Sequence, residues 1–147
     1  KILAVRFPKN KFEAKNYFRP RFWRKISNFL LQKGLFLEII LSNQKRDLHT
    51  LALLDLDPTG AGEGEQRPMQ PSSAMDVLRK MADRLDIDVE DWTVVLCSDM
   101  GTGDARITSG TPRQIEKIRD GRIHCLVLPA SLHDIEAAAL QRWVSDD

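Results

Sequence analysis

The side chains in this 147-residue sequence that are best placed to do chemistry are aspartates and histidines close to apolar runs. Asp55 and Asp57 alternate at the C-terminal end of HTLALLDLD, so both would point to the same face of a strand. Ligands often bind at such strand ends, but a paired-carboxylate site needs a further catalytic group, and the sequence shows none. We therefore interpret the pair as solvated acids. His49, His124 and His133 accompany no nucleophile motif such as GxSxG, so we assign no catalytic residue and expect the first two at strand edges or in the core.

Metal and phosphate binding have little support in the sequence. Cys97 and Cys125 lie inside apolar runs, and no CxxC or Cys/His cluster has zinc spacing. We expect both thiols to be small core residues in a reducing compartment rather than a disulfide. The segment GTGDAR has neither GxGxxG nor GxxxxGK(S/T) and no helix directly after it, which favours a plain turn. The sequence thus predicts no metal site.

Positive charge is concentrated at the start of the chain, although the net charge is +1. Residues 1–46 hold 12 Lys or Arg against two acidic residues, whereas residues 47–147 hold 10 against 19. Aromatic rings are interleaved with the cations between residues 8 and 25. Cations bind phosphates and rings stack on unpaired bases, so nucleic-acid contact is one interpretation; the alternative is a solvated surface with some rings in the core. The candidate contacts are Lys9, Lys11, Lys15, Arg19, Arg21, Trp23, Arg24 and Lys25.

The elements that must position these residues form an α/β pattern. Apolar runs predict strands at 2–5, within 47–57, at 92–98 and at 123–129, with a short extended piece at 106–108. Their apolar character is continuous rather than alternating, which indicates strands covered on both faces. Helical spacing predicts helices over 21–34, 36–45 and 73–85, one starting near 112, and a last one over 131–144. The alternation of strands and helices predicts a mixed sheet with flanking helices.

Several local signals set boundaries within this pattern. The polar segment PTGAGEGEQRP (58–68) predicts a flexible loop, and the change in composition divides the chain into a basic, aromatic-rich arm (1–35, with a strand and a helix) and a domain (36–147). Serine residues at 72 or 73 are expected to cap the third helix, which carries an apolar stripe of methionine and leucine. Thr111, Pro112 and Gln114 form a capping-box start, and Ser131 and Asp134 have the same spacing.

Four segments in a fixed order carry a family resemblance. FLEIILSNQKRDLHTLALLDLD contains Asn43 followed by HTLALLD, and MQPSSAMDVL, VVLCSDMGTGDARITSGT and GRIHCLVLPASLHDIE come after it. Together they resemble the C-terminal half of diphthine synthase, from about Phe36 to Trp143. This family comprises the S-adenosylmethionine-dependent methyltransferases of diphthamide synthesis, which have a fold like that of the tetrapyrrole methylases. The resemblance implies the fold of their C-terminal domain.

The same resemblance implies a cofactor, site residues and a partner. S-adenosylmethionine would be bound with contributions from Leu54, from Met100 after the third strand, and from His124 at the start of the last strand; no metal is implied. The methyl acceptor would be the modified histidine of elongation factor 2. The family's glycine-rich N-terminal domain is not expected in this chain. The chain would then be a fragment, and its cofactor site would have to be completed by a second copy or by a complementing chain.

Three functional classes therefore stay open. The first is the methyltransferase, as a fragment or half enzyme. The second is a non-catalytic methylase-like module that binds the ribosome or ribosomal RNA through the basic arm, with strongly salt-dependent binding. The third is a structural partner in a split heterodimer. No apolar run reaches the length of a membrane span and KILAVRFP is too short for a signal peptide, so we expect a cytoplasmic protein without membrane contact.

Overall fold

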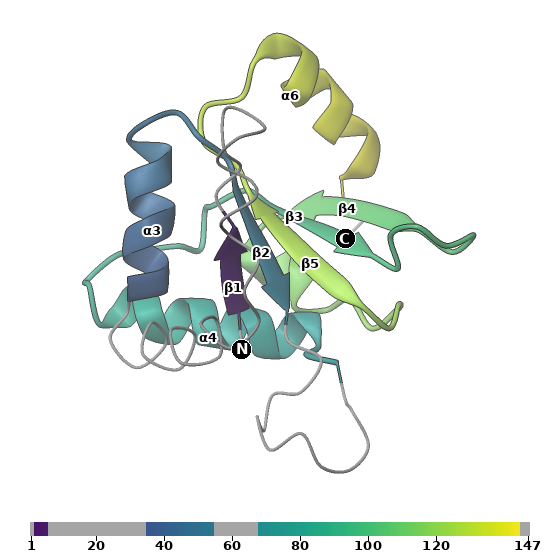
Figure 1. The fold of residues 1–147 in the computed structure, drawn as a ribbon, viewed down its shortest axis with the longest axis horizontal. Coiled ribbons are helices and arrows are strands. Elements are labelled where there is room, and N and C mark those ends of the chain that lie inside the picture. Colours follow the sequence, from purple (N-terminus) through teal and green to yellow (C-terminus); the bar gives the residue numbers. More distant parts are fainter. Residues whose placement is uncertain (1, 6–34, 55–67, 145–147) are drawn as a thin grey trace, which may run out of the picture.

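A computed structural model describes residues 2–5, 35–54 and 68–144, and Figure 1 shows how their elements are arranged. The predicted helix at 21–34, most of the predicted 58–68 loop, both candidate aspartates and all eight candidate nucleic-acid contacts lie outside the described residues. The elements in chain order are β1 (Ile2–Val5), α3 (Leu35–Gln44), β2 (Thr50–Leu54), α4 (Pro71–Asp83), β3 (Val94–Ser98), β4 (Arg106–Gly110), α5 (Pro112–Ile115), β5 (His124–Leu128), α6 (Asp134–Leu140) and the 3-10 turn η1 (Gln141–Trp143).

The strands form one five-stranded sheet in the order β1-β2-β5-β3-β4. The predicted α/β class with flanking helices is confirmed, but all four ladders are antiparallel, where mixed pairing was expected. The cause is the position of β5. Strands β2 and β3 run in the same direction, as the helical connection between them predicts, yet β5 lies between them and runs the opposite way. Strands β2 and β3 are therefore parallel to each other, but they are not adjacent and form no ladder together.

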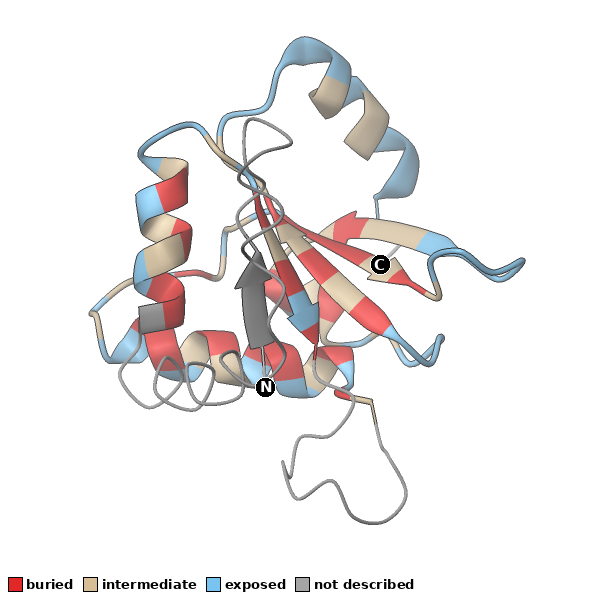
Figure 2. Cartoon of the chain, in the orientation of Figure 1, coloured by how far each residue is buried: buried red, intermediate tan, exposed pale blue. Residues whose placement is uncertain are grey.

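Helices α3 and α4 pack on one face of the sheet and enclose the core (Figure 1). The predicted apolar side of α3 is confirmed, because Phe36, Leu37 and Ile40 are at most 2% exposed. Side chains from alternate strand positions meet them, and Figure 2 shows this alternation as buried bands between half-buried or exposed ones along β2 and β5. The buried side chains that α4 contributes are Pro71, Ala74, Met75, Leu78, Met81 and Ala82, in agreement with the predicted stripe.

Helices α3 and α4 end, and helix α5 begins, with recognisable capping motifs. Asp47 and Asp86 adopt positive φ after α3 and α4, and the amide of the residue that follows each of them bonds back to the carbonyl of Asn43 or Ala82. These are Schellman-type stops, in which a residue of left-handed conformation allows the last carbonyls to be satisfied. The start of α5 was predicted correctly: Thr111 is the N-cap and its amide donates to Gln114 Oε1 at 2.9 Å.

Two other predicted helix starts were wrong by one to three residues. Helix α4 begins at Pro71 with Gln70 as its N-cap, not with a serine at 72 or 73. Proline fixes the φ that a first helical residue needs, which explains the earlier start. Helix α6 begins after His133, whose amide donates to Glu136 Oε2 at 2.9 Å, so Ser131 and Asp134 are not its capping pair.

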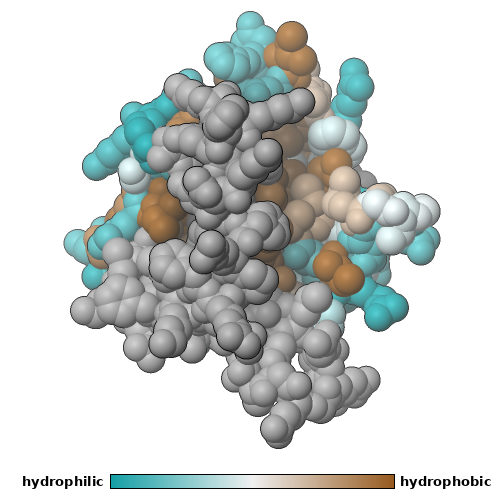
Figure 3. Space-filling view, in the orientation of Figure 1, coloured by the Kyte–Doolittle hydropathy of each residue, from teal (hydrophilic) through white to brown (hydrophobic). Residues whose placement is uncertain are grey.

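The described elements cover the second face of the sheet, which we call the open face, less completely than the sequence predicted. Leu53 is 41% exposed and both cysteines are half-buried, because α3 and α4 pack against the opposite face while α6 stands over one end of this one (Figure 1). Figure 3 shows apolar surface over the middle of the sheet on this side. Among the described residues, no helix is both long enough and apolar enough to cross a membrane.

Candidate functional site

The three residues expected to contact a cofactor come together at one end of the sheet. Leu54 ends β2, and the residue before it, Leu53, pairs with Cys125 of β5. His124 begins β5 and pairs with Ser98, the last residue of β3. Met100 lies in the turn that follows β3. Antiparallel pairing around β5 thus places the ends of β2 and β3 beside the start of β5, although these positions are 24 to 70 residues apart in the sequence.

His124 is a buried and partly satisfied histidine. Its ring lies on the helix-packed side of the sheet and is 3% exposed, and Nδ1 is 2.9 Å from the hydroxyl of Ser98. Nε2 has no hydrogen-bond partner among the described residues. Burial lowers the pKa of His124, and Asp99 opposes this shift. The imidazole is therefore neutral near pH 7, and one of its buried ring nitrogens is not satisfied by any residue that the structure describes.

Asp99 ties together the two turns that frame this histidine. It adopts positive φ, its amide donates to the carbonyl of Ile123 at 2.8 Å, and its carboxylate accepts bonds from the amides of Arg122 and Ile123 at 3.0–3.1 Å. The bonds from Ile123 and Arg122 lower the pKa of the Asp99 carboxyl. The aspartate that follows β3 is thus a structural clamp between the 99–103 and 119–123 turns.

Gly121 is the site residue that the sequence reasoning missed. It has φ of +93°, and a Cβ built on it would lie 2.9 Å from His124 Cε1 and 3.0 Å from Ser98 Cβ. A side chain at this position would therefore push on the buried histidine directly. A glycine three residues before a predicted strand was the available signal, but a turn of unknown geometry gave no reason to weigh it above other glycines.

The remaining candidates lie elsewhere or differ from expectation. Met100 is in the right turn but 54% exposed, so it borders the site rather than lining a closed pocket. The GTGDAR segment is a turn, as predicted. His49 lies at the other end of the sheet, where Nδ1 accepts the Ala130 amide at 2.9 Å and Nε2 is 3.3 Å from Glu136. The two cysteines are half-buried on the open face rather than in the core.

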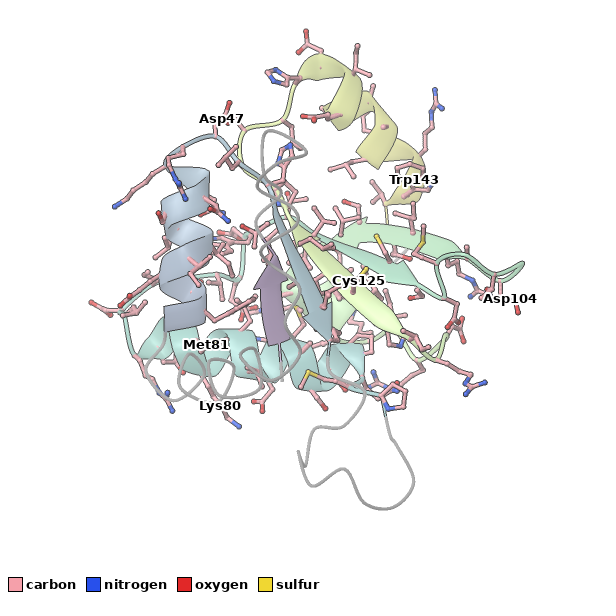
Figure 4. All side chains as sticks on the ribbon, viewed as in Figure 1. Asp47, Lys80, Met81, Asp104, Cys125 and Trp143 are labelled. Atoms are coloured by element: carbon pink, nitrogen blue, oxygen red, sulfur yellow. The ribbon has the colours of Figure 1, made fainter. Side chains whose placement is uncertain are left out.

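A cavity of about 250 Å³ lies under α6 on that open face. Its floor is formed by apolar side chains of β3, β4 and β5, and its far wall by α6 and Trp143 (labelled in Figure 4). His49 and Glu136 stand at its rim. This cavity is on the side of the sheet opposite the His124 ring, so it is not part of the cofactor site that the resemblance implies.

Comparisons with known proteins agree with the resemblance. A scan against the profiles of known protein families finds no match. The chain is 30% identical over 108 residues to the diphthine synthase of Methanocorpusculum labreanum, a match that covers 73% of this chain and 40% of the relative. It is also 30% identical over 120 residues to a probable diphthine methyl ester synthase of Arabidopsis thaliana, covering 72% and 43%. The chain thus spans about two fifths of the length of these relatives.

Solved structures give the same result for the fold. A diphthine synthase crystal structure superposes with a TM-score of 0.60 at 26% identity, covering 74% of this chain and 39% of that one. A protein of Entamoeba histolytica assigned as a diphthine synthase gives a TM-score of 0.64 at 22% identity, covering 76% and 45%, which supports the fold alone. Sequence and fold therefore agree, and over the part it shares with these relatives the chain is diphthine synthase-like.

Proposed function

We propose that this chain supplies one wall of an S-adenosylmethionine site and takes part in methyl transfer to the modified histidine of elongation factor 2. The observation that carries the proposal is the convergence of Leu54, Met100 and His124 at one sheet end, because these are the positions at which the resemblance implies cofactor contacts. The relatives that are 30% identical are described as diphthine synthases, and this supports the same class of reaction here.

The residues present fit such a cofactor. An adenosyl group has apolar faces and a polar edge, and binding sites for such groups combine apolar walls with a few fixed polar atoms. Leu54 is a buried apolar side chain at the end of β2, and His124 Nε2 is a buried polar atom without a partner among the described residues. The Asp99 carboxylate fixes the adjoining turn through the amides of Arg122 and Ile123. These groups fit one wall of a pocket.

Each of these groups has a physical role in that pocket. When bound, S-adenosylmethionine supplies a methyl group on a positively charged sulfonium. Leu54 would exclude water from one side of the cofactor. A neutral His124 adds no positive charge close to the sulfonium, and the lowered pKa that follows from its burial keeps it neutral. We assign no catalytic residue to the described part. The proposed contribution of this wall is to hold the cofactor in the orientation that methyl transfer needs.

Most of each relative's length lies outside the match, and the opposite wall is proposed to come from there. The acceptor, elongation factor 2, is the partner that such an enzyme needs. Location in the cytoplasm follows from the same proposal.

The proposal is tested by calorimetric titration of the purified chain with S-adenosylmethionine. Saturable binding is expected, and Leu54→Ala should weaken it by about tenfold or more, since it removes buried apolar contact. Leu53→Ala is the matched control, because this neighbour is 41% exposed and points to the opposite face. Folding of each variant is checked by circular dichroism. Equal weakening by both substitutions, or no binding by the folded wild type up to millimolar ligand, would contradict the proposal.

A second candidate function rests on the charge of the first 46 residues, which hold 12 Lys or Arg against two acidic residues. We propose that the arm (1–35) binds a polyanion such as ribosomal RNA, with Lys9, Lys11, Lys15, Arg19, Arg21, Trp23, Arg24 and Lys25 as contacts. Retention on heparin should fall steeply as salt rises and should be lost on deletion of residues 1–34. Retention that survives the deletion would refute this second function.

A further inference from the structure

Cys97 and Cys125 form a pair of thiols on the open face of the sheet. They are directly opposite each other in the β3–β5 ladder, and Figure 4 labels Cys125 on β5 in the middle of the sheet. Both are free and half-buried. They are the two cysteines of the whole sequence, so no other thiol competes for a ligand within one chain.

The type of strand pair disfavours a disulfide at this position. The Asp99 amide donates to its opposite residue, Ile123, at 2.8 Å, which marks that pair as hydrogen-bonded. Pair types alternate along an antiparallel ladder, so Cys97 and Cys125, two residues further on, are again a hydrogen-bonded pair with Cα atoms about 5.5 Å apart. Cβ atoms in such wide pairs are about 5.5 Å apart, whereas a disulfide needs about 3.8 Å.

The surroundings of the pair select a soft ligand. Leu53 pairs with Cys125 on one side, and Ile107 pairs with Cys97 on the other, so the row across the sheet runs from leucine through two thiols to isoleucine. Among the described residues no three His, Cys, Asp or Glu side chains are grouped as metal ligands. Iron–sulfur centres and structural zinc take four protein ligands and catalytic zinc takes three, and this row offers two.

We propose that Cys97 and Cys125 form a two-thiolate site for a soft monovalent metal ion of the Cu(I) class. Thiolates prefer such ions, and two metal–sulfur bonds of about 2.3 Å each bridge up to about 4.6 Å, which suits a wide strand pair. The ion replaces the two thiol protons, which pass to solvent, and no electron is transferred. The inference rests on the sheet and not on the proposed methyltransferase function.

The test is an anaerobic titration of the reduced full chain with Cu(I) against a coloured Cu(I) chelator, followed by the near-ultraviolet sulfur-to-copper absorption. We expect one Cu(I) per chain. Cys97→Ser and Cys125→Ser should each lower the affinity by about 100-fold or more, because the second thiolate acts at high effective concentration. A single variant that binds like the wild type, or one metal ion per two chains, would overturn the proposal.

Two measurements on the unmodified chain keep the test independent of how the variants fold. Bound Cu(I) should protect both thiols from alkylation by iodoacetamide, as counted by mass spectrometry. Oxidised glutathione should produce little intramolecular disulfide in the metal-free chain. Protection of one thiol alone, or rapid and complete disulfide formation, would show that the two sulfur atoms do not form the proposed site.

Discussion

The hydrogen bond between Asn43 and Thr50 joins α3 to β2, and its removal gives the sharpest test of how this chain sets its register. Asn43 Nδ2 donates to Thr50 Oγ1 at 3.0 Å, and Asn43 Oδ1 accepts a bond from the Arg46 guanidinium at 2.8 Å. Asn43 is 2% exposed and Thr50 is fully buried. Thr50 begins β2, so this bond fixes where the strand starts. A slip of one residue would turn Leu54 away from the helix-packed face.

Thr50→Val keeps the shape of the side chain and removes its hydroxyl. It leaves the buried Asn43 amide without this acceptor, which should lower the free energy of unfolding by about 1–3 kcal/mol. Asn43→Ala leaves the hydroxyl unpaired and also opens a cavity, so a loss of about 2–4 kcal/mol is expected. In the double variant neither the Asn43 amide nor the Thr50 hydroxyl is left behind without its partner, and the loss should be close to that of Asn43→Ala, which gives a coupling energy equal to the Thr50→Val loss, about 1–3 kcal/mol.

The assay is urea unfolding followed by circular dichroism and tryptophan fluorescence, with m values compared among variants. Thr93→Val is the matched control, because Thr93 is exposed and its substitution should change stability by less than about 0.5 kcal/mol. If Thr50→Val matches this control, or if the two single losses simply add in the double variant, the bond does not couple α3 to β2 and the argument on register fails.

Three further predictions concern the site and its supports. Gly121→Ala and Gly101→Ala both place a side chain at positive φ, but a Cβ at 121 meets His124 and Ser98 while a Cβ at 101 meets nothing within 4 Å, so Gly121→Ala should cost about 1 kcal/mol or more beyond Gly101→Ala in urea unfolding. Because burial lowers the pKa of His124, the unfolded chain binds more protons than the folded chain, so the free energy of unfolding should be highest above about pH 6.5 and should fall as pH drops toward the folded pKa. His124→Asn should flatten this pH dependence, and an unchanged slope would contradict the argument. His133→Asn, at an exposed position, is the control and should preserve the slope. Arg79 bonds Glu90 at 2.5 Å and also Glu116, and its side chain is 28% exposed, so Arg79→Ala should lower the free energy of unfolding by about 1–2 kcal/mol. Arg113 bonds the same Glu90 but is 74% exposed, so Arg113→Ala should lower it by less than about 0.5 kcal/mol. Equal losses would refute the distinction.

Local patterns in the sequence were sufficient for most elements of the domain. The apolar runs gave β2, β3 and β5, and helical spacing gave the buried side of α3 with Phe36 and Leu37. The start of α5 was predicted because Thr111, Pro112 and Gln114 act within a single turn. Features of this kind depend on neighbours in the chain, which a sequence displays directly.

Features set by long-range contacts could not be predicted in the same way. The place of β5 between β2 and β3 decides both the antiparallel pairing and the convergence of Leu54 and His124, and no local signal encodes it. The role of Gly121 depends on a histidine that folds back onto it, and the cysteines became cross-strand partners through the same ladder. The resemblance to diphthine synthase supplied the site positions where physical patterning gave none.

The most direct test of the central claim, that the sheet end holding Leu54 and His124 is the cofactor wall, is nuclear magnetic resonance of the chain titrated with S-adenosylmethionine. Amide shifts should concentrate at Leu54, in the turn at 98–101 and at 121–124, in proportion to bound ligand. Shifts centred instead on the cavity under α6, at Val95, Val127 and Leu140, would place the ligand on the opposite face and contradict the account.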